Sequence, residues 1–254
     1  MADRYVISSI VALGAVGAAS AFSCAGEPPV HCTIADGALS AKFYLVAIDG
    51  GCAPSPGDVL GVTAYVPDPL NPGNGLSKLA IQSQTVGLLR QNGESANPPV
   101  VDTNPGDVAY ALGSFATALP DSNGICAVPA LAPAALSLGA VDDPDAGLEQ
   151  PATDLRYEWS NVRVLVEASQ IGVQMTGDLT LTQNGCSGTY HVAGLWPSVS
   201  CAALDDAGNA LTDDAGNPVL DATQCSPDNG INPNVDVACD PVQALCVPTK
   251  EAPF

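Results

Sequence analysis

Nine cysteines are the most reactive side chains of the sequence, and their odd number needs an explanation. Disulfide formation in an exported protein uses cysteines in pairs and leaves one thiol over. Cys24 stands apart because it directly follows an uncharged N-terminal segment. We therefore predict a lipid on Cys24. We also predict disulfide bonds, as expected in an oxidising compartment, among the other eight cysteines: Cys32, Cys52, Cys126, Cys186, Cys201, Cys225, Cys239 and Cys246.

The segment before Cys24 has the features of an export signal. Residues 5–22 carry no charge and are rich in Gly and Ala, which is typical of a signal peptide and less apolar than a spanning helix requires. The residues directly before Cys24 resemble the box that precedes a bacterial lipoprotein cysteine. We predict a signal peptide over residues 1–23 and a lipid-anchored protein at the outer membrane or cell surface. Cleavage at an A-x-A site formed by Ala19 and Ala21, which would release a secreted protein, is the alternative.

Local spacing favours two of the disulfide pairs. Cys32 and Cys52 flank the first expected strand, and Cys239 and Cys246 flank an expected turn. We predict that each of these two couples is bonded, although sequence alone does not determine connectivity. Zinc bound by Cys225, Cys239, Cys246 and a histidine is an alternative that an oxidising compartment disfavours.

An acidic repeat near the C-terminus offers oxygen ligands. The motif DDAGN occurs twice with a period of eight, and it contains Asp205, Asp206, Asp213 and Asp214. Hard carboxylate oxygens suit Ca²⁺, but adjacent acids without a following Glu do not match an EF-hand loop. Asp followed by Gly-Asn is also typical of a tight turn. We expect structural turns that bind calcium weakly if at all, and no other cofactor.

Residues for catalysis are sparse. The chain has two histidines and none of the common hydrolase or metalloprotease motifs. A Ser/His/Asp site around His191 is the alternative to a histidine packed on a strand. Asp142 and Asp143 could serve as glycosidase carboxylates, although we expect them to be solvated. Trp159 and Trp196 could stack on a sugar, although packing in the core is the expected role. We predict a protein that is not an enzyme.

The charge balance excludes two classes of partner. The chain contains 27 acidic and 7 basic residues, for a net charge of −20. Nucleic-acid binding depends on clustered Lys and Arg, and so does attraction to anionic lipid headgroups. The chain is also 46% hydrophobic and only 13% charged, a composition typical of a folded protein.

The elements that would position these residues are mainly strands. Residues 39–48 and 59–66 are rich in β-branched and aromatic residues and predict a hairpin with a long loop. Another strand is expected over 108–119. The stretch between the two proline-rich loops alternates like a strand at first. It then allows a short helix with Thr85 as the N-cap and Gly93 as the stop.

The clearest pattern covers residues 155–200. Asn184-Gly185 between alternating apolar residues is a strong hairpin signal, because both positions of a type I′ turn need positive φ. The pattern predicts a three-stranded meander, with a β-bulge at Gly177 where the alternation slips. Residues 128–154, which are rich in Pro, Ala and Asp, are expected to form a long crossover with little regular structure.

These patterns together predict an all-β fold. We expect an antiparallel sandwich or barrel-like sheet with long loops, stapled by disulfides. Residues 24–254 would form a single β domain with an acidic, cysteine-containing extension over about 201–254.

Five sequence blocks carry a resemblance to known proteins. They resemble predicted lipoproteins of unknown function from myxobacteria and their relatives: HCTIADGALSAKFYLV, GDVLGV, LRYEWSNVRV, QNGCSGTYHVAGLWPSVSC and INPNVDVACDPVQALCVP. The resemblance is most specific in YEWSNVR and NGCSGTYHV. The resemblance implies an exported or lipidated β-protein of the cell envelope. We predict that this protein has a structural or surface-interaction role. The resemblance implies no catalytic residues. The expected partners are the membrane, through the lipid anchor, and an envelope protein, a glycan or a second copy of the chain. A calcium- or glycan-binding module and an extracellular hydrolase are the alternatives.

Overall fold

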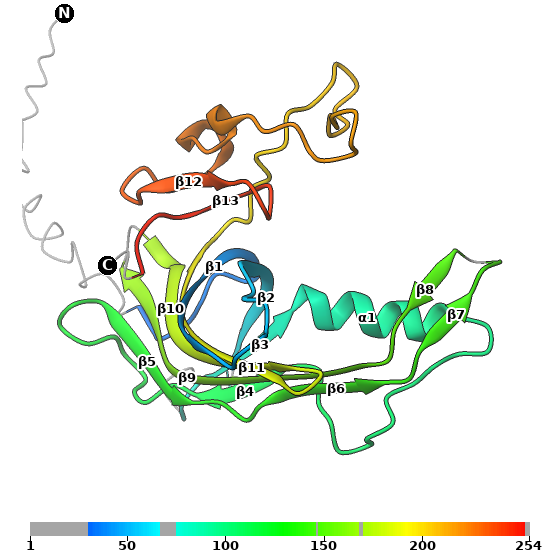
Figure 1. The fold of residues 1–254 in the computed structure, drawn as a ribbon. Helices are drawn as coiled ribbons and strands as arrows, with labels where there is room; N and C mark the ends of the chain where they lie inside the picture. The colour runs from blue at the N-terminus through cyan, green and yellow to red at the C-terminus, as the bar shows by residue number, and fades with distance from the viewer. Residues whose placement is uncertain (1–29, 67–74, 146, 168–169, 252–254) are drawn as a thin grey trace, which may run out of the picture.

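A computed structural model describes residues 30–66, 75–145, 147–167 and 170–251. Eight strands form one antiparallel sheet that curves into a barrel, in the order β4-β3-β2-β1-β11-β10-β9-β5 (Figure 1). The strands are β1 (Gly37–Ile48), β2 (Gly57–Tyr65), β3 (Lys78–Ser83), β4 (Ala111–Ser114), β5 (Ile125–Ala130), β9 (Thr153–Glu167), β10 (Gln170–Gln183) and β11 (Cys186–Leu195).

A few hydrogen bonds join the two edges of this sheet. Leu112 and Ala132 exchange two backbone hydrogen bonds, of 3.2 and 2.8 Å, and the amide of Ala116 donates to the carbonyl of Ala127 at 2.8 Å. Closing a sheet in this way leaves little unpaired strand edge. The barrel is nearly closed, which confirms the predicted all-β, barrel-like fold.

The barrel interior is a packed apolar core. Side chains alternate along each strand, so that Leu39, Ala41 and Phe43 of β1 point into the core. Met175 and Trp159 fill the same interior from β10 and β9, and both are almost completely buried. Burial of such side chains is the main stabilising contribution to the barrel.

An N-terminal strap, residues 30–36, covers one end of the barrel. The amide of Cys32 donates to the carbonyl of Ala118, and the amide of Ala35 donates to the carbonyl of Gly172, each at 2.9 Å. The side chain of Ile34 is buried in the core. The strap thereby joins the first residues of the described chain to two separate parts of the barrel.

The single α-helix of the described chain, α1 (Gln84–Ser95), lies toward the opposite end. Its N-cap is Ser83, whose hydroxyl accepts a hydrogen bond from the amide of Val86 at 3.3 Å. The predicted cap, Thr85, was therefore wrong by two residues, and the helix continues past Gly93. Ser83 is the better cap because it ends β3 and is itself held inside the barrel, where its hydroxyl lies 3.1 Å from that of Tyr157.

The predicted unstructured crossover at 128–154 was wrong. The end of β5 lies there, followed by β6 (Ala134–Leu138), β7 (Val141–Asp143) and β8 (Leu148–Gln150). β6 pairs with β9 beyond the barrel, and β7 and β8 form a separate hairpin beside α1 (Figure 1). Proline is compatible with β5 because Pro129 has no partner in the ladder with β9.

The meander was predicted correctly. β9, β10 and β11 are consecutive antiparallel neighbours. The β10–β11 turn has positive φ at Asn184 (51°) and Gly185 (82°). The register with β9 shifts between Thr176 and Asp178, on either side of Gly177, as expected for a bulge there. The β1–β2 hairpin is also confirmed. The strand expected over 108–119 is shorter, because only Ala111–Ser114 pairs with β3.

Residues 198–251, which we call the C-terminal module, pack on the outside of the barrel. They contain two short 3₁₀ turns, η1 (Ala222–Gln224) and η2 (Pro227–Asn229), and a hairpin of β12 (Val237–Asp240) and β13 (Leu245–Pro248). β13 contacts the outer faces of β1 and β11, and the module lies above these strands in Figure 1. It has a separate small core: Leu195, Cys201, Ile231, Val235 and Cys246.

Candidate functional site

All eight cysteines in the described chain form disulfides, as predicted, but both predicted pairings were wrong. The bonds are Cys32–Cys126, Cys52–Cys186, Cys201–Cys239 and Cys225–Cys246. Each partner comes from a distant part of the chain, separated by 21 to 134 residues. Proximity in the sequence did not identify the partners, because each cysteine bonds to one that the fold brings to it from a more distant segment.

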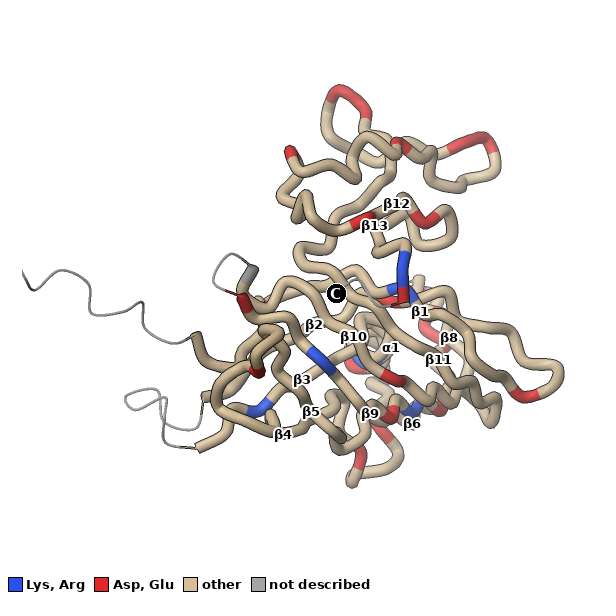
Figure 2. The backbone as a smooth tube through the Cα atoms, turned by 90° about the vertical axis from the view of Figure 1, so that its left-hand side faces the viewer, with Lys and Arg blue, Asp and Glu red and all other residues tan. Residues whose placement is uncertain are grey.

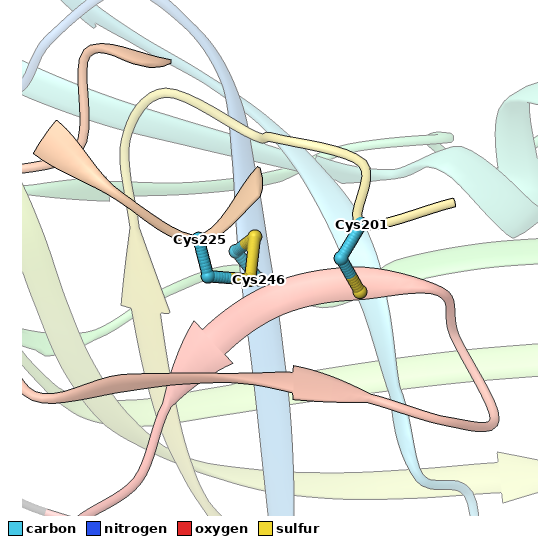
Figure 3. Close-up of side chains that lie close together, drawn as sticks. All are labelled: Cys201, Cys225 and Cys246. Atoms are coloured by element: carbon cyan, nitrogen blue, oxygen red, sulfur yellow. A yellow bond between two sulfur atoms is a disulfide. The ribbon is translucent and has the colours of Figure 1, made fainter. Parts of the chain in front are cut away.

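The C-terminal hairpin illustrates this point. Cys239 and Cys246 lie directly opposite each other in the β12–β13 ladder, yet each bonds to a cysteine outside the hairpin. Figure 3 shows the Cys225–Cys246 bond, with Cys201 on a neighbouring segment. The two disulfides therefore attach two different loops to one hairpin, which a bond within the hairpin would not do.

The same cysteines are the strongest grouping of possible metal ligands. The sulfur atoms of Cys201, Cys225 and Cys246 all lie within 4.8 Å of one another. No other group of three or more His, Cys, Asp or Glu ligand atoms this close occurs among the described residues. Metal binding requires free thiolates, and all three sulfurs are bonded in disulfides. The arrangement is a structural cross-link.

The acidic repeat forms two turns of the same geometry. In the first, one carboxylate oxygen of Asp205 accepts the amides of Ala207 and Asn209 at 2.9 and 2.8 Å. In the second, Asp213 repeats these two bonds within its own turn. The hydrogen bonds from Asn209 hold the pKa of the Asp205 carboxyl below its ordinary value. These contacts support the turn interpretation, while calcium binding stays a prediction.

The structure also shows a third copy of the repeat. The amide of residue 203 donates to the carbonyl of residue 219, that of 211 to 203, and that of 219 to 211, at 2.7 to 2.9 Å. Ala203, Leu211 and Val219 thus close a ring of backbone hydrogen bonds with a period of eight. Asp221 begins the third turn and accepts the amide of Thr223 at 3.0 Å. The eight-residue spacing of the aspartates was visible in the sequence, but the motif itself has diverged in the third copy.

His191 lies on the outer face of β11. Its Nδ1 is 2.8 Å from a carboxylate oxygen of Asp178, and about half of the histidine side chain is exposed. Hydrogen bonds from Asn161 and His191 keep the pKa of Asp178 below its ordinary value. Asp178 is the one hydrogen-bond partner that the described chain provides for this ring. An Asp–His pair is present, but within the part of the chain that the structure describes no serine hydroxyl joins it to make a triad.

The other residues considered for glycan chemistry are separated in the fold. Trp159 is 3% exposed and lies in the barrel core, whereas Trp196 packs against the edge of that core. Asp142 is exposed on β7, but Asp143 is buried and accepts the amide of Asn97 at 2.7 Å. The expectation of a solvated Asp143 was wrong, because its carboxylate fastens the loop that follows α1.

An ion pair between the barrel and the module was not predicted. Lys42 on the outer face of β1 contacts Asp240 at the end of β12. The Asp240 side chain is only 3% exposed and also accepts the amides of Val242 and Gln243. Burial disfavours its charged form, but the bonds from Lys42 and the two amides prevail and lower its pKa. Nearby, the hydroxyl of Tyr44 donates to the carbonyl of Pro248 at 2.7 Å.

The predicted lipidation site and signal peptide lie outside the described residues, which begin at Val30. Within the described residues, none of the helices has the length and apolar character needed to cross a bilayer.

Comparison with known proteins identifies the barrel. The family model described as MlpA matches residues 38–197, from the second residue of β1 to just beyond β11. The chain belongs to the MlpA family. It is similar to the Myxococcus xanthus protein described as "Putative lipoprotein MlpA", with 31% identity over 202 residues, 77% of this chain and 72% of the relative. The resemblance to myxobacterial lipoproteins is thereby confirmed. No solved structure matches the chain.

The MlpA match ends close to the end of the last barrel strand, β11. The match ends at Pro197, and the C-terminal module begins at the next residue. The part of the chain that matches the family model is therefore the barrel with its helix and the β7–β8 hairpin.

Proposed function

We propose that this MlpA-family protein is exported, lipidated at Cys24 and held at the outer membrane or cell surface, where it acts as a non-catalytic interaction protein. The similarity to a protein named as a lipoprotein is the observation that carries this proposal. Four disulfides support export, because such bonds persist in oxidising compartments.

The position of the strap indicates how an anchored protein would be oriented. Cys24 precedes Val30, the first described residue, by only six residues. Six residues span at most about 20 Å. The Cys32–Cys126 disulfide fixes the strap to β5 just beyond this point. A lipid on Cys24 would keep the strap end of the barrel close to the bilayer and direct the α1 end away from it.

The packing of the barrel favours an interaction role at its outer surface. Phe43, Trp159 and Met175 fill the interior, where a ligand-carrying barrel would have a cavity. The one Asp–His pair discussed above is exposed and lies outside any assembled triad. These features support a protein that presents a rigid surface rather than one that performs a reaction.

The anchor is tested on protein purified from membranes. Intact mass spectrometry should show a chain that begins at Cys24 and carries two or more acyl chains, because one chain alone anchors only marginally. Cys24→Ala should move the protein from the membrane fraction to the soluble fraction. Ser20→Ala is the matched control and should remain in the membrane. A mature N-terminus at Phe22 without lipid would contradict the proposal and support secretion.

A further inference from the structure

A groove runs along the outside of the barrel beside α1. Its volume is about 570 Å³, within the range of about 300–1,000 Å³ that is usual for ligand sites. The outer face of β2 and β3 forms the floor, and the first turns of α1 form one wall. The groove follows β2 from Val59 to Tyr65, about 20 Å for the six steps between successive residues of the strand. We propose that this groove binds an uncharged, linear oligosaccharide.

The side chains along the groove suit a sugar. Tyr65 and Tyr110 are 56% and 45% exposed, and aromatic rings with a polar end can pack on the apolar face of a sugar while bonding a hydroxyl. Three exposed glutamines also line the groove: Gln82, Gln84 and Gln91. Each amide both donates and accepts hydrogen bonds, as recognition of neutral hydroxyl groups requires.

Two glycines keep the groove open. Gly61 lies within β2 and Gly87 within α1, and neither has a positive φ. A Cβ on Gly87 would meet nothing within 4 Å, and a Cβ on Gly61 would make only an ordinary contact with the carbonyl of Gln82. Glycine is unfavourable inside strands and helices, and the surrounding chain gives no steric reason for it at either position. A ligand in the groove would provide that reason, because side chains there would occupy its space.

The charge of the groove argues against other occupants. Asp36 is the one charged residue among the described residues that line the groove, although the chain as a whole has a net charge of −20. A cationic partner would be expected to meet more carboxylates, and an anionic glycan or a second copy of the chain would be repelled. A peptide strand has no free edge to pair with, because β2 is bonded to β1 and β3 on its two sides.

This inference rests on the proposed non-catalytic role and names the ligand class. The test is isothermal titration calorimetry on the full, lipidated protein in detergent. The probes are three neutral hexasaccharides (maltohexaose, cellohexaose and chitohexaose) and one anionic probe, hexagalacturonate. We expect at least one neutral probe to bind with a Kd of about 1 mM or tighter, and hexagalacturonate not to bind.

Filling the groove should separate binding from stability. Gly87→Leu should weaken binding by at least about tenfold while raising Tm by about 2 °C, because leucine favours a helix more than glycine does. Gly61→Val fills the groove from the sheet side and should weaken binding likewise. Tyr65→Ala should weaken binding by about three- to tenfold through lost stacking. Gly50→Leu is the matched control, since Gly50 also has open space around it but lies outside the groove, and it should bind as the parent does.

Three results would overturn the inference: no binding of any neutral probe, binding that Gly87→Leu and Gly61→Val leave unchanged, or binding of hexagalacturonate as tight as that of the neutral probes. The proposed function fails on different observations. Loss of the lipid is seen by mass spectrometry without any sugar, and cleavage of a bound hexasaccharide, detected by chromatography, would contradict the non-catalytic role while leaving the groove as its site.

Discussion

The barrel and the C-terminal module are stabilised in different ways. The barrel buries a continuous cluster of apolar side chains drawn from all of its strands. The module has five buried core residues, one of which, Leu195, belongs to the barrel strand β11. Two disulfides lie within the module and compensate for its small core.

The two regions also differ at their surfaces. The turns of the acidic repeat place carboxylates at the tips of the module loops (Figure 2). Among the described residues that line the groove on the barrel, in contrast, there is a single carboxylate, that of Asp36. The module, which disulfides stabilise, therefore has an acidic surface made of loops. The barrel, which apolar packing stabilises, has an outer surface of strands with room for a ligand.

The largest expected effects come from removing disulfides in each region. Cys225→Ser with Cys246→Ser should unfold the module locally, because a loss of about 3 kcal/mol exceeds what its small core can withstand. The control, Cys32→Ser with Cys126→Ser, opens a longer loop, for which chain entropy predicts a loss of about 4–5 kcal/mol of stability. The barrel should nevertheless remain folded, because its apolar core stabilises it. Limited proteolysis with mass mapping checks both variants. Cleavage in the barrel before the module would break the comparison.

Truncation of one core residue in each region should give a smaller contrast. Leu60→Ala in the barrel should lower the free energy of unfolding by about 2–5 kcal/mol, because tightly packed surroundings cannot close the cavity. Ile231→Ala in the module should leave the barrel transition unchanged. Both variants are made in a Trp196→Phe background, because Trp196 lies beside Ile231. Urea titration followed by the fluorescence of the buried Trp159 then reports on the barrel. Equal shifts in the two variants would show that barrel and module unfold as one unit.

The ion pair between the regions should have a moderate effect. Lys42→Met leaves the buried Asp240 carboxylate with only its two backbone donors and should weaken docking of the module by about 1–3 kcal/mol. Lys250→Met, which removes an exposed pair with Asp236, is the matched control and should change nothing measurable. Hydrogen exchange of the amides in β12 and β13 is the readout. Equal exchange in the two variants would assign no role to the buried pair.

The same pair predicts a pH dependence. The pKa of Asp240 is lower in the folded protein, so its contribution is present above the ordinary aspartate value of about 3.9. It is lost as the pH falls through the lower folded value. We compare hydrogen-exchange rates of the β13 amides after correction for the intrinsic effect of pH. These corrected rates should be constant between about pH 5 and pH 8 and should rise below about pH 4. If the module stayed docked in Lys42→Met below about pH 4 but came off in the parent protein, the result would contradict this assignment.

The smallest expected effect concerns calcium. The carboxylates of Asp205 and Asp213 are already engaged by their own turns, so a bound ion would compete with these bonds. Calorimetry should show a Kd no tighter than about 0.1–1 mM, the range of weak extracellular sites. A low-micromolar Kd that is lost in Asp205→Asn, Asp213→Asn would show that the repeat is a true calcium site.

Local signals in the sequence were sufficient for much of the barrel. The turn at Asn184-Gly185 and the bulge at Gly177 depend on backbone conformation within a few residues. The β-branched and aromatic composition of residues 39–48 predicted β1, and the alternating apolar residues over 155–200 predicted β9. The even number of cysteines after Cys24 predicted that all eight would pair. Each of these inferences needed only the chemistry of neighbouring residues.

Only the tertiary structure decided which distant segments meet. The disulfide partners, the contact of Lys42 with Asp240 and the groove between β2 and α1 each join residues that are far apart in the chain. Local propensity carries no information about such separations, because many pairings satisfy it equally well. The choice among them depends on how the sheet closes and packs as a whole, so the covalent cross-links follow the fold and cannot be read from the spacing of the cysteines.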